Sequence, residues 1–109
     1  MTYDDVVKIA LALPGTEEGI AYRAPCVKRE GKFMLAPKKD GVTMAVKLDW
    51  ATHDRLLEEH PDVFYKTPHY DGYAAFLVRL PKLTKKVAQE LVTASWENAP
   101  KPSTRRRAQ

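Results

Sequence analysis

The sequence contains a single cysteine, Cys26, and it lacks the features of several specialised protein classes. One cysteine cannot form an internal disulfide, and such sparse use fits a reducing compartment. No apolar run approaches the roughly 18 residues that a membrane span requires. The acidic start at residues 2–5 lacks the basic opening of a signal peptide. These absences predict a cytoplasmic protein that does not enter the membrane.

Motifs for catalysis, metal binding and phosphate loops are also missing. There is no Gly-x-Ser-x-Gly element, and nothing places a histidine beside Cys26, which we interpret as a buried, inert thiol. His53 and His60 stand seven residues apart, so they cannot form the close ligand pair of an i, i+4 motif. The five glycines form no glycine-rich loop. We therefore expect no enzymatic activity, no cofactor and no bound metal.

The chain of 109 residues is 44% hydrophobic and 29% charged, which is typical of one globular domain. A domain of this size buries roughly 65% of its unfolded surface, enough for a core without disulfides. The net charge of +4 comes entirely from residues 101–109, because residues 1–100 sum to zero. We predict one domain over residues 1–100, followed by a disordered basic tail at 101–109.

Three segments show helical periodicity, at residues 2–13, 50–60 and 85–99. Each stops at or near a proline. Each also begins at a side chain that can accept hydrogen bonds from the first turn: Thr2, Asp49 and Thr84. Lys85 and Lys86 occupy the first turn of the last helix, the end that the helix dipole makes unfavourable for cations.

Apolar or alternating runs predict strands at 20–29, 32–37, 42–48, 64–66 and 74–80. Pro25 interrupts the first of these, and residues 16–19 are expected to form a connecting loop. The turns Glu30-Gly31 and Asp40-Gly41 indicate antiparallel hairpins. Together the elements predict an α+β fold, in which an antiparallel β-sheet carries helices packed on one face.

Basic residues are concentrated in two segments, because residues 23–39 carry a net charge of +5 and residues 79–86 a net charge of +4. If the fold brings these segments together, their side chains can neutralise phosphates and bind DNA with little sequence preference. The alternative is a solvated sheet face whose lysines prevent edge-to-edge aggregation. The predicted nucleic-acid-binding residues are Arg23, Lys28, Lys38, Lys39, Arg79, Lys82, Lys85 and Lys86.

The segment 67–73 is polar and aromatic, and it leads directly into the apolar strand 74–80. His69 can contact a phosphate or another ligand and Tyr70 can stack on a base, so both are candidates for ligand contact. In the alternative, His69 bonds the loop backbone and the tyrosine covers the edge of the core. Trp50 and Trp96 are interpreted as core anchors.

Several short motifs occur in a characteristic order along residues 3–99, and through them the chain resembles the MmcQ/YjbR family of small bacterial proteins. The motifs are Leu13-Pro14-Gly15-Thr16-Glu17-Glu18, Ala24-Pro25, Gly31-Lys32, Lys47-Leu48-Asp49, Phe64 with Thr67-Pro68-His69-Tyr70, and Ala94-Ser95-Trp96.

The resemblance implies an antiparallel sheet that carries helices, in an arrangement likened to a double-winged DNA-binding fold. Members of the family are commonly labelled DNA-binding, and the family supplies no catalytic residues. We therefore predict weak, largely phosphate-directed DNA binding through basic hairpins. The alternative is a protein-interaction module, adaptor-like or chaperone-like, without catalytic activity.

Overall fold

One antiparallel sheet, with strand order β1-β2-β3-β4-β6-β5, organises the residues described by the computed structural model, which are 1–21 and 23–101. The expected disorder of the tail therefore lies, beyond Lys101, outside the described residues. The strands are β1 (Thr16–Ala21), β2 (Ala24–Arg29), β3 (Lys32–Pro37), β4 (Thr43–Lys47), β5 (Phe64–Tyr65) and β6 (Ala75–Arg79). The helices are α1 (Tyr3–Leu11), α2 (Trp50–Glu59) and α3 (Lys85–Asn98), with short 3₁₀ turns η1 (Pro68–Tyr70) and η2 (Leu80–Lys82).

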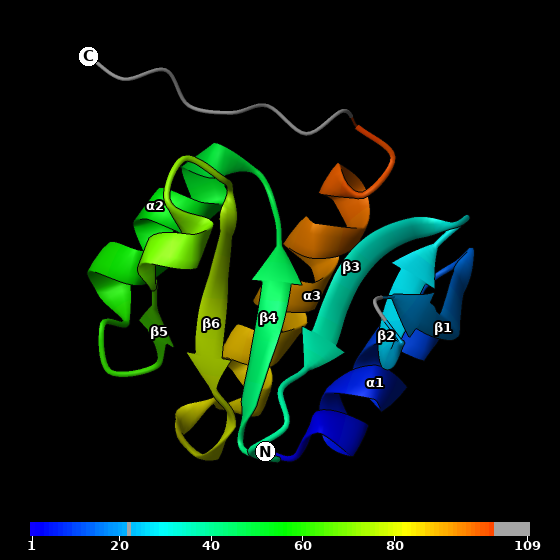
Figure 1. Ribbon diagram of the computed structural model, residues 1–109, viewed down its shortest axis with the longest axis horizontal. Coiled ribbons are helices and arrows are strands. Elements are labelled where there is room, and N and C mark those ends of the chain that lie inside the picture. Colours follow the sequence, from blue (N-terminus) through cyan, green and yellow to red (C-terminus); the bar gives the residue numbers. More distant parts are fainter. Residues whose placement is uncertain (22, 102–109) are drawn as a thin grey trace.

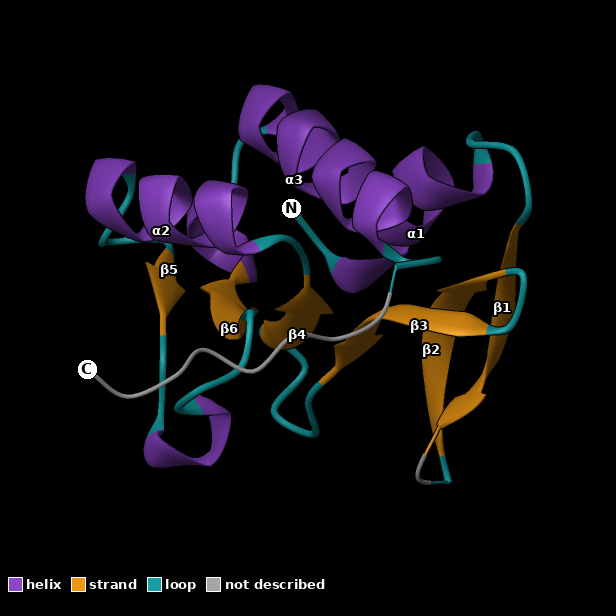
Figure 2. Cartoon of the chain, turned by 90° about the horizontal axis from the view of Figure 1, so that it is seen from above, coloured by secondary structure: helices purple, strands orange, loops and turns teal. Residues whose placement is uncertain are grey.

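All three helices lie on one face of the sheet, so the predicted α+β fold is confirmed (Figures 1 and 2). The predicted caps start each helix, because the side chains of Thr2, Asp49 and Thr84 accept hydrogen bonds from backbone N–H groups in the first turn. Asp5 completes a capping box with Thr2. Among the described residues, none of the helices is long and apolar enough to cross a membrane.

The expectation of one strand over residues 20–29 is wrong, because this segment contributes to two strands joined by a turn. Residues 16–19, expected as a loop, belong to β1, which pairs with β2 from Thr16 opposite Arg29 to Ala21 opposite Ala24. At the turn Arg23 has a φ of +63°, a left-handed conformation that residues other than glycine seldom adopt. The sequence offers no glycine or asparagine there to signal a turn.

The predicted hairpins at residues 30–31 and 38–41 are present, and they join β2 to β3 and β3 to β4. Glu30 and Gly31 both have positive φ, as the tight turn between β2 and β3 requires. The register between β2 and β3 shifts so that Lys28 lies opposite Phe33 and Val27 opposite Leu35. Met34 is therefore the extra residue of a β-bulge, and both Met34 and Leu35 are buried.

The core lies between the sheet and the helices. On the sheet side it contains Leu35, Val46, Phe76 and Val78, and on the helix side it contains residues such as Leu91. Ser95 on α3 is fully buried, and its single hydroxyl proton is shared between the carbonyl oxygens of Lys47, at 2.6 Å, and Met34, at 3.3 Å. One hydroxyl thus ties α3 to the bulge of β3 and to the end of β4.

Candidate functional site

The face of the sheet opposite the helices carries a groove with a volume of about 1660 Å³. In Figure 2, η1 and the β1–β2 hairpin project on this side from the two flanks of the sheet. Residues of both segments line the groove, so they form its two walls. Its floor includes three alanines of the central strands: Ala36, Ala45 and Ala75. Because these side chains are small, the floor stays hollow between the two walls.

Lysine and aromatic side chains are prominent in the lining of this groove. The lining lysines are Lys28, Lys38, Lys47 and Lys101, and the lining aromatic side chains are Phe33, Trp50, His69, Tyr70 and Tyr73. Among the residues that the structure describes, Asp49 is the only acidic one lining the groove, and its carboxylate already accepts hydrogen bonds from the backbone N–H and hydroxyl of Thr52. The groove therefore favours an anionic ligand with flat rings.

Lys47 is the lysine on the floor of the groove, at the end of β4. Burial lowers the pKa of its ammonium group, and the positive charge of Lys32 lowers it further. Among the described residues, Lys47 forms no ion pair that would offset this cost. The fold thus holds a partly buried cation without a counter-charge.

Lys66 holds the wall formed by residues 67–73 in place. Its ammonium group donates to the carbonyl oxygen of Tyr73 at 2.7 Å and lies 3.0 Å from Nε2 of the buried His53. The backbone N–H of Tyr70 bonds the carbonyl of Thr67, which closes η1. These contacts place the rings of Tyr70 and Tyr73 at the groove.

Four of the predicted site residues line this groove, namely Lys28, Lys38, His69 and Tyr70. Lys38 Nζ lies 5.8 Å from the centre of the Tyr70 ring, so the turn between β3 and β4 faces η1. The imidazole of His69 meets the same ring edge-on, with centroids 4.9 Å apart. Arg23 and Lys39 are exposed in turns beside the groove residues but do not line it.

The other predicted basic cluster lies outside the groove. Arg79 stacks over the ring of Tyr65 at 4.1 Å, near the edge strand β5. Lys82 lies in η2, while Lys85 and Lys86 occupy the first turn of α3, which packs on the opposite face of the sheet (Figure 2). Arg79 pairs with Thr43 just after the Lys38–Lys39 turn, so the two clusters approach each other only at this end of the sheet.

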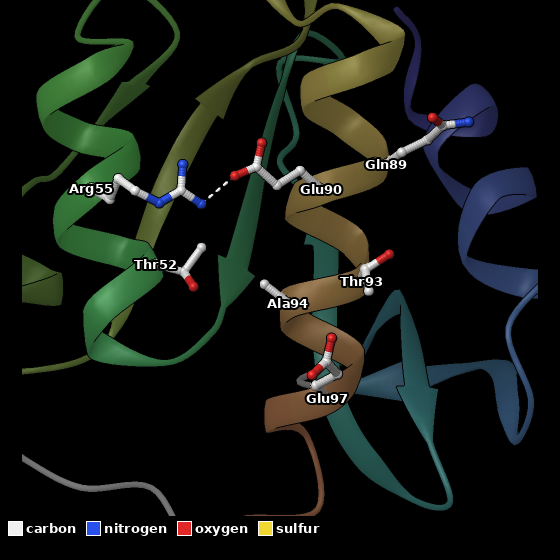
Figure 3. A pocket seen from close by; sticks show the side chains of 7 residues that line it. All are labelled: Thr52, Arg55, Gln89, Glu90, Thr93, Ala94 and Glu97. Atoms are coloured by element: carbon white, nitrogen blue, oxygen red, sulfur yellow. Dashed lines mark hydrogen bonds and ion pairs between the residues drawn. The ribbon is translucent and has the colours of Figure 1, made fainter.

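A second, smaller hollow of about 420 Å³ lies between α2 and α3. Figure 3 shows Arg55 of α2 reaching across it to Glu90 of α3. This hydrogen bond raises the pKa of the Arg55 guanidinium, which also bonds Glu59. Because the charges of Arg55 and Glu90 are paired with each other, this hollow is a weaker candidate. Over residues 1–21 and 23–101, no cluster of three or more histidine, cysteine or acidic side chains could hold a metal ion.

The sequence did not single out Lys47, Phe33 or Trp50 as site residues. Alternation placed Lys47 on the outward face of its strand, which was a usable signal. Trp50, expected as a core anchor, lines the groove instead, whereas Trp96 packs against the core. Phe33, Lys47 and Trp50 come from β3, β4 and the start of α2, so the strand order is what brings them into one groove.

The fold and groove together define a small α+β protein with a basic, ring-lined concave sheet. The chain is 34% identical to an uncharacterized protein of Mycobacterium bovis over 115 aligned residues, which cover 87% of this chain and 85% of that protein. Uncharacterized proteins of two Mycobacterium tuberculosis strains match with the same identity and coverage. The chain belongs to the family of these mycobacterial proteins. No family model and no solved structure matches it.

Proposed function

We propose that this protein is a nucleic-acid-binding module of the MmcQ/YjbR type, which binds DNA weakly and mainly through its phosphates. The observation that carries the proposal is the groove on the open face, where the described lining contains four lysines, several aromatic rings and one carboxylate that is already engaged. Such a surface attracts a polyanion and offers rings on which bases can stack. In this proposal the protein is a binding protein of the cytoplasm and has no catalytic role.

The shape of the groove favours single-stranded over duplex DNA. Duplex readers insert a protruding helix or ribbon into a DNA groove about 12 Å wide. Here the rings of Tyr70 and Tyr73 lie in a concave face instead, where they are accessible to unpaired bases. The proposal includes the double-winged arrangement that the family resemblance implies. In it, the β1–β2 hairpin and the 67–73 segment, which form the two walls of the groove, act as the two wings.

Fluorescence anisotropy with a labelled single strand and the matching duplex tests the proposal. The single strand should bind more tightly, and its affinity should fall with salt with a log–log slope of about −2 to −3, as three or four phosphate contacts imply. No binding of either oligonucleotide at low salt contradicts the proposal. Truncation after Lys101 should retain most of the affinity; a complete loss would assign the binding to residues 102–109.

Two matched double charge reversals locate the interface. Lys28→Glu with Lys38→Glu alters the groove, and the expected result is a loss of affinity of about tenfold or more. Lys85→Glu with Lys86→Glu changes the net charge equally in the first turn of α3, where acidic residues suit the helix dipole. This control should keep affinity within about twofold. The reverse outcome would place the interface on the helix side.

A protein-interaction module is the second candidate. It is favoured by Ile20, whose side chain is 70% exposed on the edge strand β1 and lines the groove. An exposed apolar side chain on an edge strand suits an added strand from a partner. Binding of a purified protein partner that Ile20→Asp abolishes, without any oligonucleotide binding, would support this candidate instead.

A further inference from the structure

Phe33 lies on the floor of the groove between two lysines, and the inference drawn from this placement rests on the proposed function. Phe33 lies on β3, directly opposite Lys28 of the neighbouring strand β2. On the other side of β3, Leu35 pairs with Val46 of β4, which places Lys47 beside the bulged residue that follows Phe33. One ring is therefore flanked by a lysine on each neighbouring strand.

The spacing of these lysines suits a single oxyanion. Neighbouring strands lie about 4.8 Å apart, so Lys28 and Lys47 start roughly 10 Å from each other across β3. Each ammonium group is carried on a flexible four-carbon stem, and two such stems can meet above the ring between them. The stem of Lys28 packs over Gly19, where an added Cβ would lie 3.4 Å from its Cδ, and its side chain lines the groove.

The energetics of Lys47 indicate that this arrangement serves a ligand. Burial and the charge of Lys32 disfavour its ammonium form, and no carboxylate of the described residues pairs with it. Burying an uncompensated cation costs stability unless an anion arrives to pair with it. Asp49, the acid that lines the same groove, is engaged by the first turn of α2.

We propose that Lys28 and Lys47 hold one phosphate group of a nucleotide above Phe33, with the base stacked against an aromatic ring of the groove. The alanines of the floor leave room for this unit, and the 67–73 wall supplies Tyr70 and Tyr73 as further rings. The groove volume of about 1660 Å³ exceeds the few hundred to 1,000 Å³ of a typical small-molecule pocket. The site is therefore suited to one nucleotide unit of a longer strand.

Titration of the full-length protein with adenosine monophosphate, adenosine and inorganic phosphate, followed by NMR, tests this site. Adenosine monophosphate should shift the resonances of Phe33 and bind at least tenfold more tightly than either fragment. Inorganic phosphate that binds as tightly as the nucleotide would overturn the role of the ring. Adenosine that binds as tightly would overturn the role of the two lysines.

The variant Lys47→Met has a double readout that a merely structural lysine would not give. It should raise the melting temperature without ligand, because an uncompensated cation is removed, and it should weaken adenosine monophosphate binding at least fivefold. Lys86→Met, on the exposed first turn of α3, should leave the affinity unchanged and raise the melting temperature only slightly, because the helix dipole disfavours a cation there. A lower melting temperature, or an unchanged affinity, for Lys47→Met overturns the proposal.

Measuring both DNA and adenosine monophosphate binding to Lys47→Met distinguishes a failure of the phosphate site from a failure of the proposed function. Single-stranded DNA that binds equally well to the wild type and to Lys47→Met leaves the proposed function standing and overturns the phosphate site. Adenosine monophosphate binding that depends on Lys47, without any oligonucleotide binding, supports the site and overturns the proposed function.

Discussion

The ammonium group of Lys66 lies 3.0 Å from Nε2 of His53, a side chain that is only 3% exposed. On the other side of the ring, Nδ1 lies 2.9 Å from the carboxylate of Asp54. A carboxylate only accepts hydrogen bonds, so Nδ1 carries the proton and Nε2 accepts from Lys66. Lys66 also donates to the Tyr73 carbonyl. Through Lys66, the neutral imidazole of His53 therefore connects α2 to the start and to the end of the 67–73 wall.

Replacing Lys66 with methionine should therefore destabilise the protein by about 1–2 kcal/mol, because His53 and Tyr73 both lose its donated hydrogen bonds. His53→Phe, which keeps a ring to stack on Phe76, should be destabilising as well. Urea unfolding of both single variants and the double variant measures their coupling. We expect a coupling energy of at least about 0.5 kcal/mol; additive effects would show that the contact contributes nothing.

Ser95→Ala should destabilise the fold by about 1–2 kcal/mol, since the buried hydroxyl donates to the Lys47 carbonyl at 2.6 Å and also approaches the Met34 carbonyl at 3.3 Å. The loss should appear as a lower urea midpoint with an unchanged m-value. Thr93→Ala, at an exposed position of the same helix, is the matched control and should be neutral or slightly stabilising. Equal losses for the two variants would contradict a specific role for Ser95.

The fold class and nearly all elements follow from local sequence signals. Thr2, Asp49 and Thr84 start helices because their oxygens satisfy backbone donors that the helix itself leaves unpaired. The strand at 43–47 follows from alternation, with Met44 and Val46 in the core. These signals act within a few residues, which is why the sequence alone reveals them.

The groove could not be predicted in the same way, because it depends on which strands become neighbours. Lys28 and Lys38 were found from their charge, but their grouping with Phe33 and Lys47 requires the order of β2, β3 and β4. The bulge at Met34 carries no local signal either, and it decides which side chains of β3 face the helices. Packing also decides that Lys28 and Lys38 lie on the open face of the sheet while Lys85 and Lys86 lie on the helix side.

Arg23→Gly should stabilise the protein by about 0.5–1 kcal/mol, since glycine adopts a φ near the observed +63° without the steric cost of a Cβ. Arg23→Ala is the control: it removes the same charge but keeps the Cβ, so it should give no such gain. Thermal unfolding of the two variants distinguishes relief of strain from loss of charge. A gain of equal size in both would attribute the effect to charge.

Asp40 should make stability depend on pH in acid. Its carboxylate accepts hydrogen bonds from the Thr43 hydroxyl and from two backbone N–H groups, and these bonds, led by the one from Thr43, lower its pKa below the ordinary value near 3.8. A lowered folded pKa means that the contribution is complete above the unfolded pKa and is lost as pH falls through the folded value.

The melting temperature of Asp40→Asn, compared with the wild type from pH 7 to pH 2.5, tests this linkage. We expect the wild type to be more stable at neutral pH, and the difference to shrink below about pH 4, where the carboxylate takes up its proton. A difference that stays constant down to the lowest pH would show that the charge of Asp40 does not matter to the turn.

Arg29 and Trp96 link the sheet to α3, because the guanidinium carbon lies 3.7 Å from the centre of the indole ring and Nη1 donates to the Trp96 carbonyl. Arg29→Lys keeps the charge but removes the flat group that stacks on the ring while donating sideways. We expect a loss of about 1–2 kcal/mol in urea unfolding followed by circular dichroism. The reciprocal change at the adjacent position, Lys28→Arg, lies in the groove and should alter stability by less than about 0.5 kcal/mol. If both exchanges have the same effect, stacking on Trp96 is not what stabilises this side of the sheet.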